Sequence, residues 1–180
     1  SAERIKLVDD LNPYVTANYA NLNEVKPASI SYKSSTENLS ADVAHNVEIL
    51  TARQIEVARQ EQERGVSLIG PHRDDLHLQL GDFPAKGYAS HGESWSMAIA
   101  LRIGSYTLLK SEGADPVLIL DDIFAELDNQ RRQQLTAVTQ LAEQTIITTA
   151  VESDLPPELL SAKFYVSPGR VSQEKGAIDG

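Results

Sequence analysis

The spacing of apolar residues changes along the chain, and each change marks the border of a predicted element. Residues 2–25 carry apolar side chains at helical spacing, and Pro13 is expected to bend or restart this helix. Residues 28–34 alternate between apolar and polar positions, which predicts a short strand. A long helix is predicted from Ser40 to Gly65, and its very polar last two turns favour a solvated helix over a binding face.

The pattern then changes to the period of two that is typical of strands. Leu76, Leu78 and Leu80 alternate with polar residues before Gly81 and Asp82, which predicts a β-hairpin. Helices predicted at residues 90–110 and 129–143 then alternate with two strands predicted to be buried, the fully apolar residues 117–120 and residues 145–149. A last β pair is predicted at residues 164–172. Strands that are apolar on both faces are typical of buried parallel sheets. The sequence therefore predicts an α/β fold with a parallel sheet covered by helices.

Composition narrows the class of protein. The 180 residues suit one domain, or one and a half, and the 41% that are apolar are enough for a core. With 26 acidic against 16 basic residues the formal charge is −10, which excludes an overall basic field for nucleic acid but not a local basic patch. The absence of cysteine excludes disulfides and zinc–thiolate sites and fits a cytoplasmic location. No apolar run approaches the roughly 20 residues that a membrane span needs.

The candidate chemistry begins at the end of the predicted strand 117–120, where the carboxylates of Asp121 and Asp122 follow an apolar run. Open α/β sheets bind ligands at the carboxyl ends of their strands. Successive strand residues point to opposite faces, so one carboxylate can hold Mg²⁺, usually through water, while the other polarises an attacking water. The structural alternative is a solvated strand end followed by an aspartate N-cap. Asp128 favours the functional interpretation, because it closes a tight turn at the same edge.

A second candidate lies in the stretch SHGESW, residues 90–95. Ser90 and Glu93 have the spacing of a capping box, which is a good structural explanation. The same stretch offers an anion seat, because Ser90 and Gly92 begin a helix whose free N–H groups and dipole attract a phosphate. The charge of Glu93 would repel that phosphate unless the side chain turns back to the cap.

Four adjacent polar residues form a third cluster, His72, Arg73, Asp74 and Asp75. A salt-bridged turn between strands is the favoured interpretation, although a functional site stays open. A metal site is disfavoured, because the residues are too close together in sequence to surround one ion from a strand.

The order of these motifs resembles a known superfamily. The helix start SHGE, the strand PVLILDD and the loop AELD are similar to the C-terminal lobe of an ABC-type ATPase head, a superfamily that includes the SMC heads. With IGPHRDDL and FYVSPGRVS added, the chain resembles the C-terminal part of the RecF family, closely over residues 67–172. The resemblance implies that residues 1–64 end a helical arm and that residues 65–180 form the C-terminal lobe of the head.

The resemblance also implies roles for individual residues in ATP chemistry. Asp121 stands at the Walker B position that holds Mg²⁺, and Asp122 stands at the position of the catalytic carboxylate. Ser90, Gly92 and Glu93 stand in the signature that reaches the γ-phosphate of ATP held by the other subunit of a homodimer.

Two further positions follow from the same resemblance. Asp128 matches the D-loop, which crosses the dimer interface, and Thr149 stands where many ABC proteins have a switch-loop histidine. The signature itself departs from the family, because Glu93 and Trp95 replace the Gln and Arg that are common there.

The chain contains no phosphate-binding loop of the form GxxxxGK[ST], and none of its glycines is followed by lysine. In RecF-like heads this Walker A loop precedes the helical arm, so the chain is expected to be a fragment that is inactive alone. The implied parent is a weak, DNA-stimulated ATPase that binds gapped DNA and single-strand/duplex junctions. With RecR and RecO it would help RecA onto single-stranded DNA in repair, recombination, replication restart and the SOS response.

Two alternatives stay open. One is the C-terminal half of another SMC-like head, such as an overcoming-lysogenization-type ATPase, although the heptads here are too short for a long coiled coil. The other is a non-enzymatic interaction module of the same fold, and the intact strings LDD and ELD argue against it.

Overall fold

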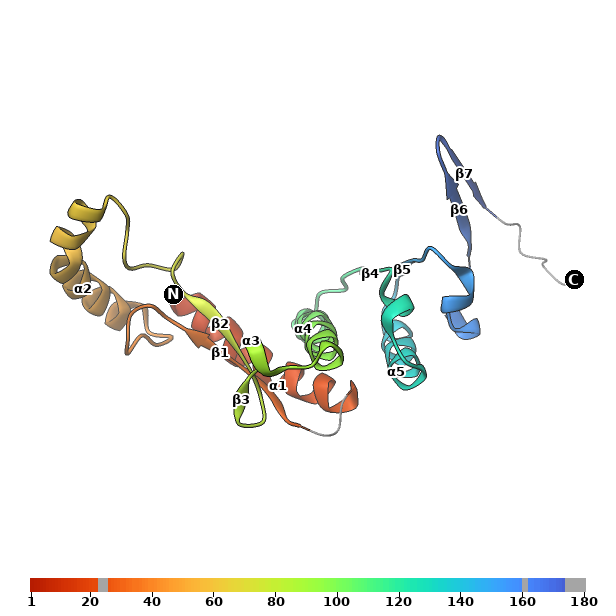
Figure 1. The fold of residues 1–180 in the computed structure, drawn as a ribbon, viewed down its shortest axis with the longest axis horizontal. Helices are drawn as coiled ribbons and strands as arrows, with labels where there is room; N and C mark the ends of the chain where they lie inside the picture. The colour runs from red at the N-terminus through yellow and green to blue at the C-terminus, as the bar shows by residue number, and fades with distance from the viewer. Residues whose placement is uncertain (23–25, 160–161, 174–180) are drawn as a thin grey trace, which may run out of the picture. The chain divides into compact units, whose positions relative to one another are not determined.

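The computed structural model describes residues 1–22, 26–159 and 162–173 (Figure 1). The chain divides into two compact units, Ser1–Ala114 and Asp115–Gly180. The elements of the first unit are α1 (Ala2–Leu22), β1 (Ala28–Lys33), α2 (Val43–Arg64), β2 (Asp75–Leu80), β3 (Phe83–Pro84), α3 (Ala85–Tyr88) and α4 (His91–Ser111). Those of the second unit are β4 (Leu118–Asp121), η1 (Ile123–Glu126), α5 (Asn129–Thr139), β5 (Thr145–Thr148), η2 (Glu152–Asp154), η3 (Pro157–Leu159), β6 (Phe164–Ser167) and β7 (Arg170–Gln173).

The core of the first unit lies where α1 packs against α4 and β1. Val15, Tyr19 and Ala100 are fully buried there, each with 0% exposure. At Gly104 of α4 the two helices approach so closely that a β-carbon would lie 3.2 Å from the backbone nitrogen of Val15. Glycine suits this crossing, because a larger residue would force the backbones apart.

The first helix differs from its prediction in one respect. α1 runs from Ala2 to Leu22 through Pro13 as a single helix, so of the two predicted effects of Pro13 the restart is wrong, while the bend stays a prediction. Proline removes one helical hydrogen bond and crowds the carbonyl of the preceding turn, and burial of the apolar face of α1 against α4 and β1 sustains the helix despite that cost. The last three residues of the predicted helix, 23–25, lie outside the described residues.

A three-stranded antiparallel sheet with the order β1-β2-β3 completes the first unit (Figure 1). β1 pairs with β2 along its whole length, and β2 turns into β3 through Gly81 and Asp82. Gly81 has a φ of 57°, which glycine adopts without strain in such a tight turn. The predicted strand at residues 28–34 and the predicted hairpin are both confirmed. The pairing of β1 with β2 crosses the predicted boundary between residues 64 and 65, and the assignment of residues 1–64 to a helical arm stays a prediction.

The long helix α2 begins later than the sequence predicts. Its N-cap is Asp42, whose carboxylate accepts from the N–H groups of Ala44 and His45, so Ser40 lies before the helix. Ser40 instead exchanges hydrogen bonds with the buried side chain of Asn46. The predicted end is confirmed, because Gly65 caps the helix with a φ of 65°. α2 buries only Asn46 and Val57, in agreement with the predicted solvated helix.

The second unit contains the predicted parallel pair, β4 and β5, and the predicted final β pair, β6 and β7, which is antiparallel. The prediction that residues 117–120 and 145–149 are fully buried is wrong. Leu118 and Leu120 are buried, but Ile119 is 64% exposed and its register partner Ile146 is 45% exposed. Side chains alternate between the two faces of a strand, and only one face of this sheet is covered in the described chain. The predicted α/β class is confirmed, although only β4 and β5 are parallel and the other described strands pair antiparallel.

Candidate functional site

The strands β4 and β5 end side by side, and the last residue of each is polar. Asp121 and Thr148 are register partners at the carboxyl ends of the two parallel strands. Four-residue strands of apolar and threonine residues position them, with Leu118 and Leu120 buried beneath the sheet end. This is the edge at which parallel sheets bind ligands, so the predicted location of the carboxylates is correct.

The hydroxyl of Thr148 connects the two aspartates. Thr148 Oγ1 donates to Asp121 Oδ1 over 2.5 Å and accepts from the backbone N–H of Asp122 over 3.1 Å. The same N–H also lies 3.1 Å from the carbonyl oxygen of Thr148. Sequence reasoning selects Thr149 and misses Thr148. The signal that could have identified Thr148 is that both strands end in a polar residue. To use it, one must know the register of β4 against β5.

Asp122 lies just beyond the strand and has a left-handed backbone conformation, with φ 50° and ψ 23°. The alternation rule therefore does not decide where its side chain points, because the residue is outside β4. Left-handed conformations are uncommon for residues other than glycine, although Asp and Asn adopt them more readily than most. Such strain is concentrated at functional sites in proteins, which favours a functional role for this turn.

The carboxylates of Asp121 and Asp122 are both exposed, so a metal ion can reach them. Within the described residues no group of three or more acidic, histidine or cysteine side chains could enclose an ion. Two carboxylates fit Mg²⁺ in particular, because this ion keeps several waters and shares its ligands with substrate phosphates instead of requiring a complete protein cage.

The other two predicted residues of the second unit have local structural roles. Asp128 is the N-cap of α5, and its carboxylate accepts from the Arg131 N–H at 2.9 Å and from Arg131 Nη1 at 2.6 Å. The hydroxyl of Thr149 donates to the carbonyl of Val151 over 2.9 Å. Both side chains are therefore engaged in local hydrogen bonds, and their parts in the D-loop and switch loop stay predictions.

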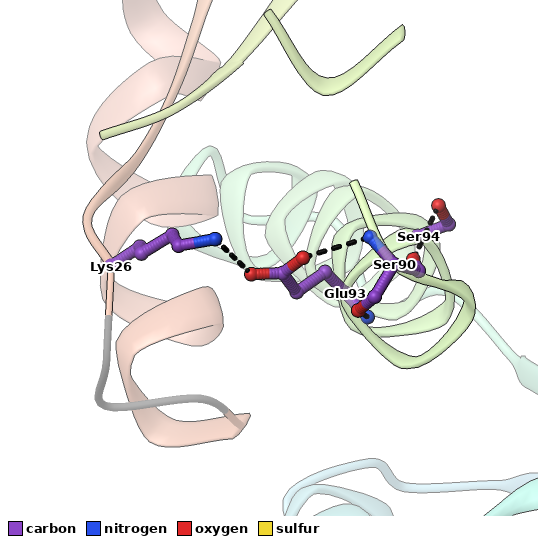
Figure 2. A network of polar contacts seen from close by, with 4 residues as sticks. All are labelled: Lys26, Ser90, Glu93 and Ser94. Atoms are coloured by element: carbon purple, nitrogen blue, oxygen red, sulfur yellow. Dashed lines mark hydrogen bonds and ion pairs between the residues drawn. The ribbon is translucent and has the colours of Figure 1, made fainter. Parts of the chain in front are cut away.

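In the first unit, Ser90 and Glu93 form the predicted capping box at the start of α4 (Figure 2). Ser90 Oγ accepts from the Glu93 N–H over 3.2 Å, and Glu93 Oε2 accepts from the Ser90 N–H over 2.8 Å. Glu93 Oε1 accepts from Lys26 Nζ over 2.7 Å. The hydrogen bond from Lys26, together with those from Ser90, lowers the pKa of Glu93 to about 2. Glu93 thus turns back to the cap, as a phosphate-binding helix start would require.

The capping box satisfies only part of the helix start. The first N–H groups of a helix have no partner inside it. Those of Ser90 and Glu93 are bonded, while within the described part of the chain no side chain accepts from those of His91 and Gly92. These two N–H groups, together with the proton of the Ser90 hydroxyl, can bind the oxygens of an anion.

The structure divides the predicted residues between its two units. Ser90, Gly92 and Glu93 lie at the start of α4 in the first unit. The second unit holds the remaining four, Asp121, Asp122, Asp128 and Thr149.

Two members of the cluster His72 to Asp75, Arg73 and Asp74, make structural contacts outside the cluster, which differs from the predicted self-paired turn. Asp74 accepts hydrogen bonds from Tyr32, Ser34 and Ser35, so it anchors the loop that follows β1. Arg73 instead donates twice to the carbonyl of Ser67. Among the described ion pairs none joins two members of the cluster.

Comparison with curated proteins identifies the relatives of this chain. It is 47% identical over 191 residues to the DNA replication and repair protein RecF of Rhodococcus erythropolis, covering 96% of the chain and 47% of that protein. It is 48% identical over 192 residues to RecF of Beutenbergia cavernae, covering 94% of the chain and 48% of that protein. Over nearly its whole length the chain is therefore similar to RecF proteins. It spans about half the length of the curated RecF relatives it matches, and no family model matches it.

Solved structures agree on the fold. The chain superposes on the recombination mediator protein RecF, described as RecF-ATPrS in the RecFOR pathway, with a TM-score of 0.79, 21% identity and 96% coverage of the chain but 46% of RecF. An SMC ATPase described in terms of ATP-driven dimerisation matches with a TM-score of 0.55 and 11% identity, over 96% of the chain and 86% of its own length. These likenesses confirm the predicted ATPase-head fold. Among the described residues, every helix is too short or too polar to span a bilayer.

Proposed function

We propose that this chain supplies the metal-side and signature elements of an ATP-dependent, DNA-binding recombination mediator that acts in DNA repair in the bacterial cytoplasm. The observation that carries the proposal is the pair Asp121 and Asp122 at the end of two parallel strands, joined by Thr148. Its setting is a chain that is 47% identical to a RecF. If the strand end had only a structural role, an exposed aspartate would be explained. The left-handed backbone of Asp122 and the hydrogen bond from its N–H to the Thr148 hydroxyl on the neighbouring strand would not be explained.

The two carboxylates have different tasks in this proposal. Asp121 would hold Mg²⁺, which neutralises charge on the phosphates when it is bound. Asp121 accepts the Thr148 hydroxyl through one oxygen, Oδ1, which fixes the direction of the carboxylate. Asp122, held outside the strand, orients the attacking water as a general base.

The signature helix acts on a second copy of the protein. The free N–H groups of His91 and Gly92 and the hydroxyl of Ser90 bind the γ-phosphate of ATP held by the other subunit, so that ATP drives a homodimer. Asp128 and Thr149 lie in loops that follow the ends of β4 and β5, where they meet the same nucleotide or the partner subunit. RecO, RecR and gapped DNA are the proposed partners, because the solved relative belongs to the RecFOR pathway, and RecA is served indirectly.

The proposal is tested in a full-length protein that contains this chain. Asp122→Asn should lower the rate of steady-state phosphate release by about 10²–10⁴-fold, because it removes the general base while keeping a residue that tolerates the left-handed conformation. The variant should still bind ATP and should stay dimeric longer. Asp121→Asn should instead weaken the Mg²⁺–ATP complex, seen as a higher Mg²⁺ requirement.

A matched control is Asp82→Asn, which changes an exposed aspartate in the turn between β2 and β3. It should leave both measurements unchanged. Hydrolysis at the parent rate by Asp122→Asn would refute the role of the second carboxylate. A complete absence of ATP hydrolysis in the unmodified protein would instead favour a non-enzymatic interaction module.

A further inference from the structure

One ion pair connects the signature helix to a distant part of the first unit. Lys26 Nζ donates to Glu93 Oε1 over 2.7 Å, across 67 positions of sequence (Figure 2). The side chain of Lys26 is 45% exposed and that of Glu93 is 14% exposed. Both oxygens of Glu93 are thus occupied, one by the lysine and the other by the Ser90 N–H.

The backbone at the start of β1 holds the lysine in place. The carbonyl of Pro27, next to Lys26, accepts from the N–H of Gly81 over 2.8 Å. The carbonyl of Ala28 accepts from the hydroxyl of Thr16 over 2.8 Å. The ammonium group therefore extends from a backbone that is fixed to the turn after β2 and to α1.

The position of Glu93 creates an electrostatic conflict. A carboxylate in the first turn stabilises a helix, because it faces the positive end of the dipole. The same carboxylate lies within one turn of the N–H groups of His91 and Gly92, where it would repel a phosphate. A lysine on the outer oxygen of Glu93 offsets that charge and also prevents the side chain from rotating toward the ligand.

We infer that Lys26 is a positioning residue for the signature helix: it holds Glu93 in the capping box and compensates its charge, so that the helix start accepts the terminal phosphate of a nucleotide. This inference rests on the proposed function, in which α4 meets ATP bound to the second subunit. The alternative is an ion pair that only stabilises the fold. Exposed ion pairs contribute little to stability. The two explanations therefore differ in which property changes when Lys26 is replaced, the stability of the fold or the response to ATP.

The test uses the full-length protein and measures the ATP concentration at which half of it is dimeric, by sedimentation velocity. Lys26→Met should raise this concentration about fivefold at low salt, because an uncompensated charge now faces the phosphate. The effect should shrink at high salt, where the repulsion is screened. Lys26→Arg keeps the charge and should restore most of the response.

The decisive variant combines two substitutions. Glu93→Gln can still accept from the Ser90 N–H but carries no charge, so Lys26→Met/Glu93→Gln should respond to ATP better than Lys26→Met alone. A purely structural pair predicts no improvement, since the single and the double variant both lack the ion pair. Lys86→Met serves as the matched control, because Lys86 is an exposed lysine near α4 with no ion pair among the described residues.

The outcomes separate the inference from the proposed function. If the unmodified protein does not dimerise with ATP, the proposed function fails and the inference fails with it. If it dimerises but Lys26→Met behaves like the Lys86→Met control, or the double variant is as impaired as Lys26→Met, only the inference is overturned. Thermal unfolding of each variant shows whether folding is retained, and if Lys26→Met is unfolded, Lys26→Arg and Glu93→Gln decide by the same measurement.

Discussion

At the scale of single residues, the hydroxyl of Thr148 explains how two adjacent aspartates are held in different environments. It donates to the carboxylate of Asp121 and accepts from the backbone of Asp122. The donor fixes the direction of a carboxylate that is otherwise exposed to water, and the acceptor stabilises the turn in which Asp122 has positive φ. The geometry of the site thus depends on a residue that carries no charge.

Replacement of Thr148 tests this dependence in the full-length protein. Thr148→Val keeps the β-branched shape but removes both hydrogen bonds, and it should lower apparent Mg²⁺ affinity or ATP turnover about 10- to 100-fold, as loss of an orienting partner usually does. Thr148→Ser is the matched control, since it retains the hydroxyl and should stay near the parent value. Equal behaviour of the Val and Ser variants would show that the hydroxyl has no such role.

At the scale of elements, the carboxylate of Asp74, just before β2, organises the loop after β1. Its oxygens accept from the hydroxyls of Tyr32, Ser34 and Ser35 and from the Ser35 N–H. Burial raises the pKa of Asp74, but the hydrogen bonds from Tyr32 and the two serines outweigh burial and hold the pKa below its ordinary value. The charged form is therefore the one that the folded loop prefers.

Because the pKa of Asp74 is lowered in the folded chain, the stabilisation that Asp74 gives to this loop depends on pH. The stabilisation by Asp74 is fully present above the ordinary aspartate pKa of about 3.9 and is lost as the pH falls through the lower pKa of the folded state. Asp74→Asn should lower the free energy of unfolding by about 1–2 kcal/mol at pH 7 and should flatten its dependence on acid pH. Urea unfolding of the chain at neutral and acid pH measures both effects. Asp75→Asn, an exposed neighbour, is the control, and an identical pH profile for both variants would contradict the prediction.

At the scale of the whole molecule, charge and missing motifs limit what the chain does by itself. Its formal charge of −10 opposes a nucleic acid, because non-specific affinity comes from lysine and arginine neutralising phosphates. Asp121 and Asp122 also lack a Gly-Lys-Ser or Gly-Lys-Thr loop in this sequence to hold the phosphates that Mg²⁺ would bridge.

We therefore expect the 180-residue chain to release no phosphate from ATP above background and to bind duplex DNA only weakly at physiological salt. Malachite-green assays and fluorescence anisotropy with a labelled duplex measure these properties, with a full-length protein as the positive control. Submicromolar duplex binding by the chain would show that a local basic patch suffices. ATP turnover by the chain would show that the phosphates are held by residues outside the known motif.

Features that depend on neighbouring residues could be predicted from the sequence. The capping box of Ser90 and Glu93, the cap at Gly65 and the turn at Gly81 are confirmed, because the groups that bond there are at most four positions apart or share one backbone turn. The start of α2 is the exception. Ser40 is a good N-cap in isolation, but Asp42 takes that place and the buried Asn46 engages Ser40 instead.

The sequence by itself determined the order of helices and strands, most of their ends and the position of the two aspartates at a strand end, since periodicity, capping and turn chemistry are local. The tertiary structure alone decided which distant groups meet. Thr148 reaches Asp121 across 27 positions, Tyr32 reaches Asp74 across 42, and Lys26 reaches Glu93 across 67. It also decided that one face of β4 and β5 is exposed. Such contacts depend on strand register and helix packing, which hydrophobic pattern restricts but does not specify.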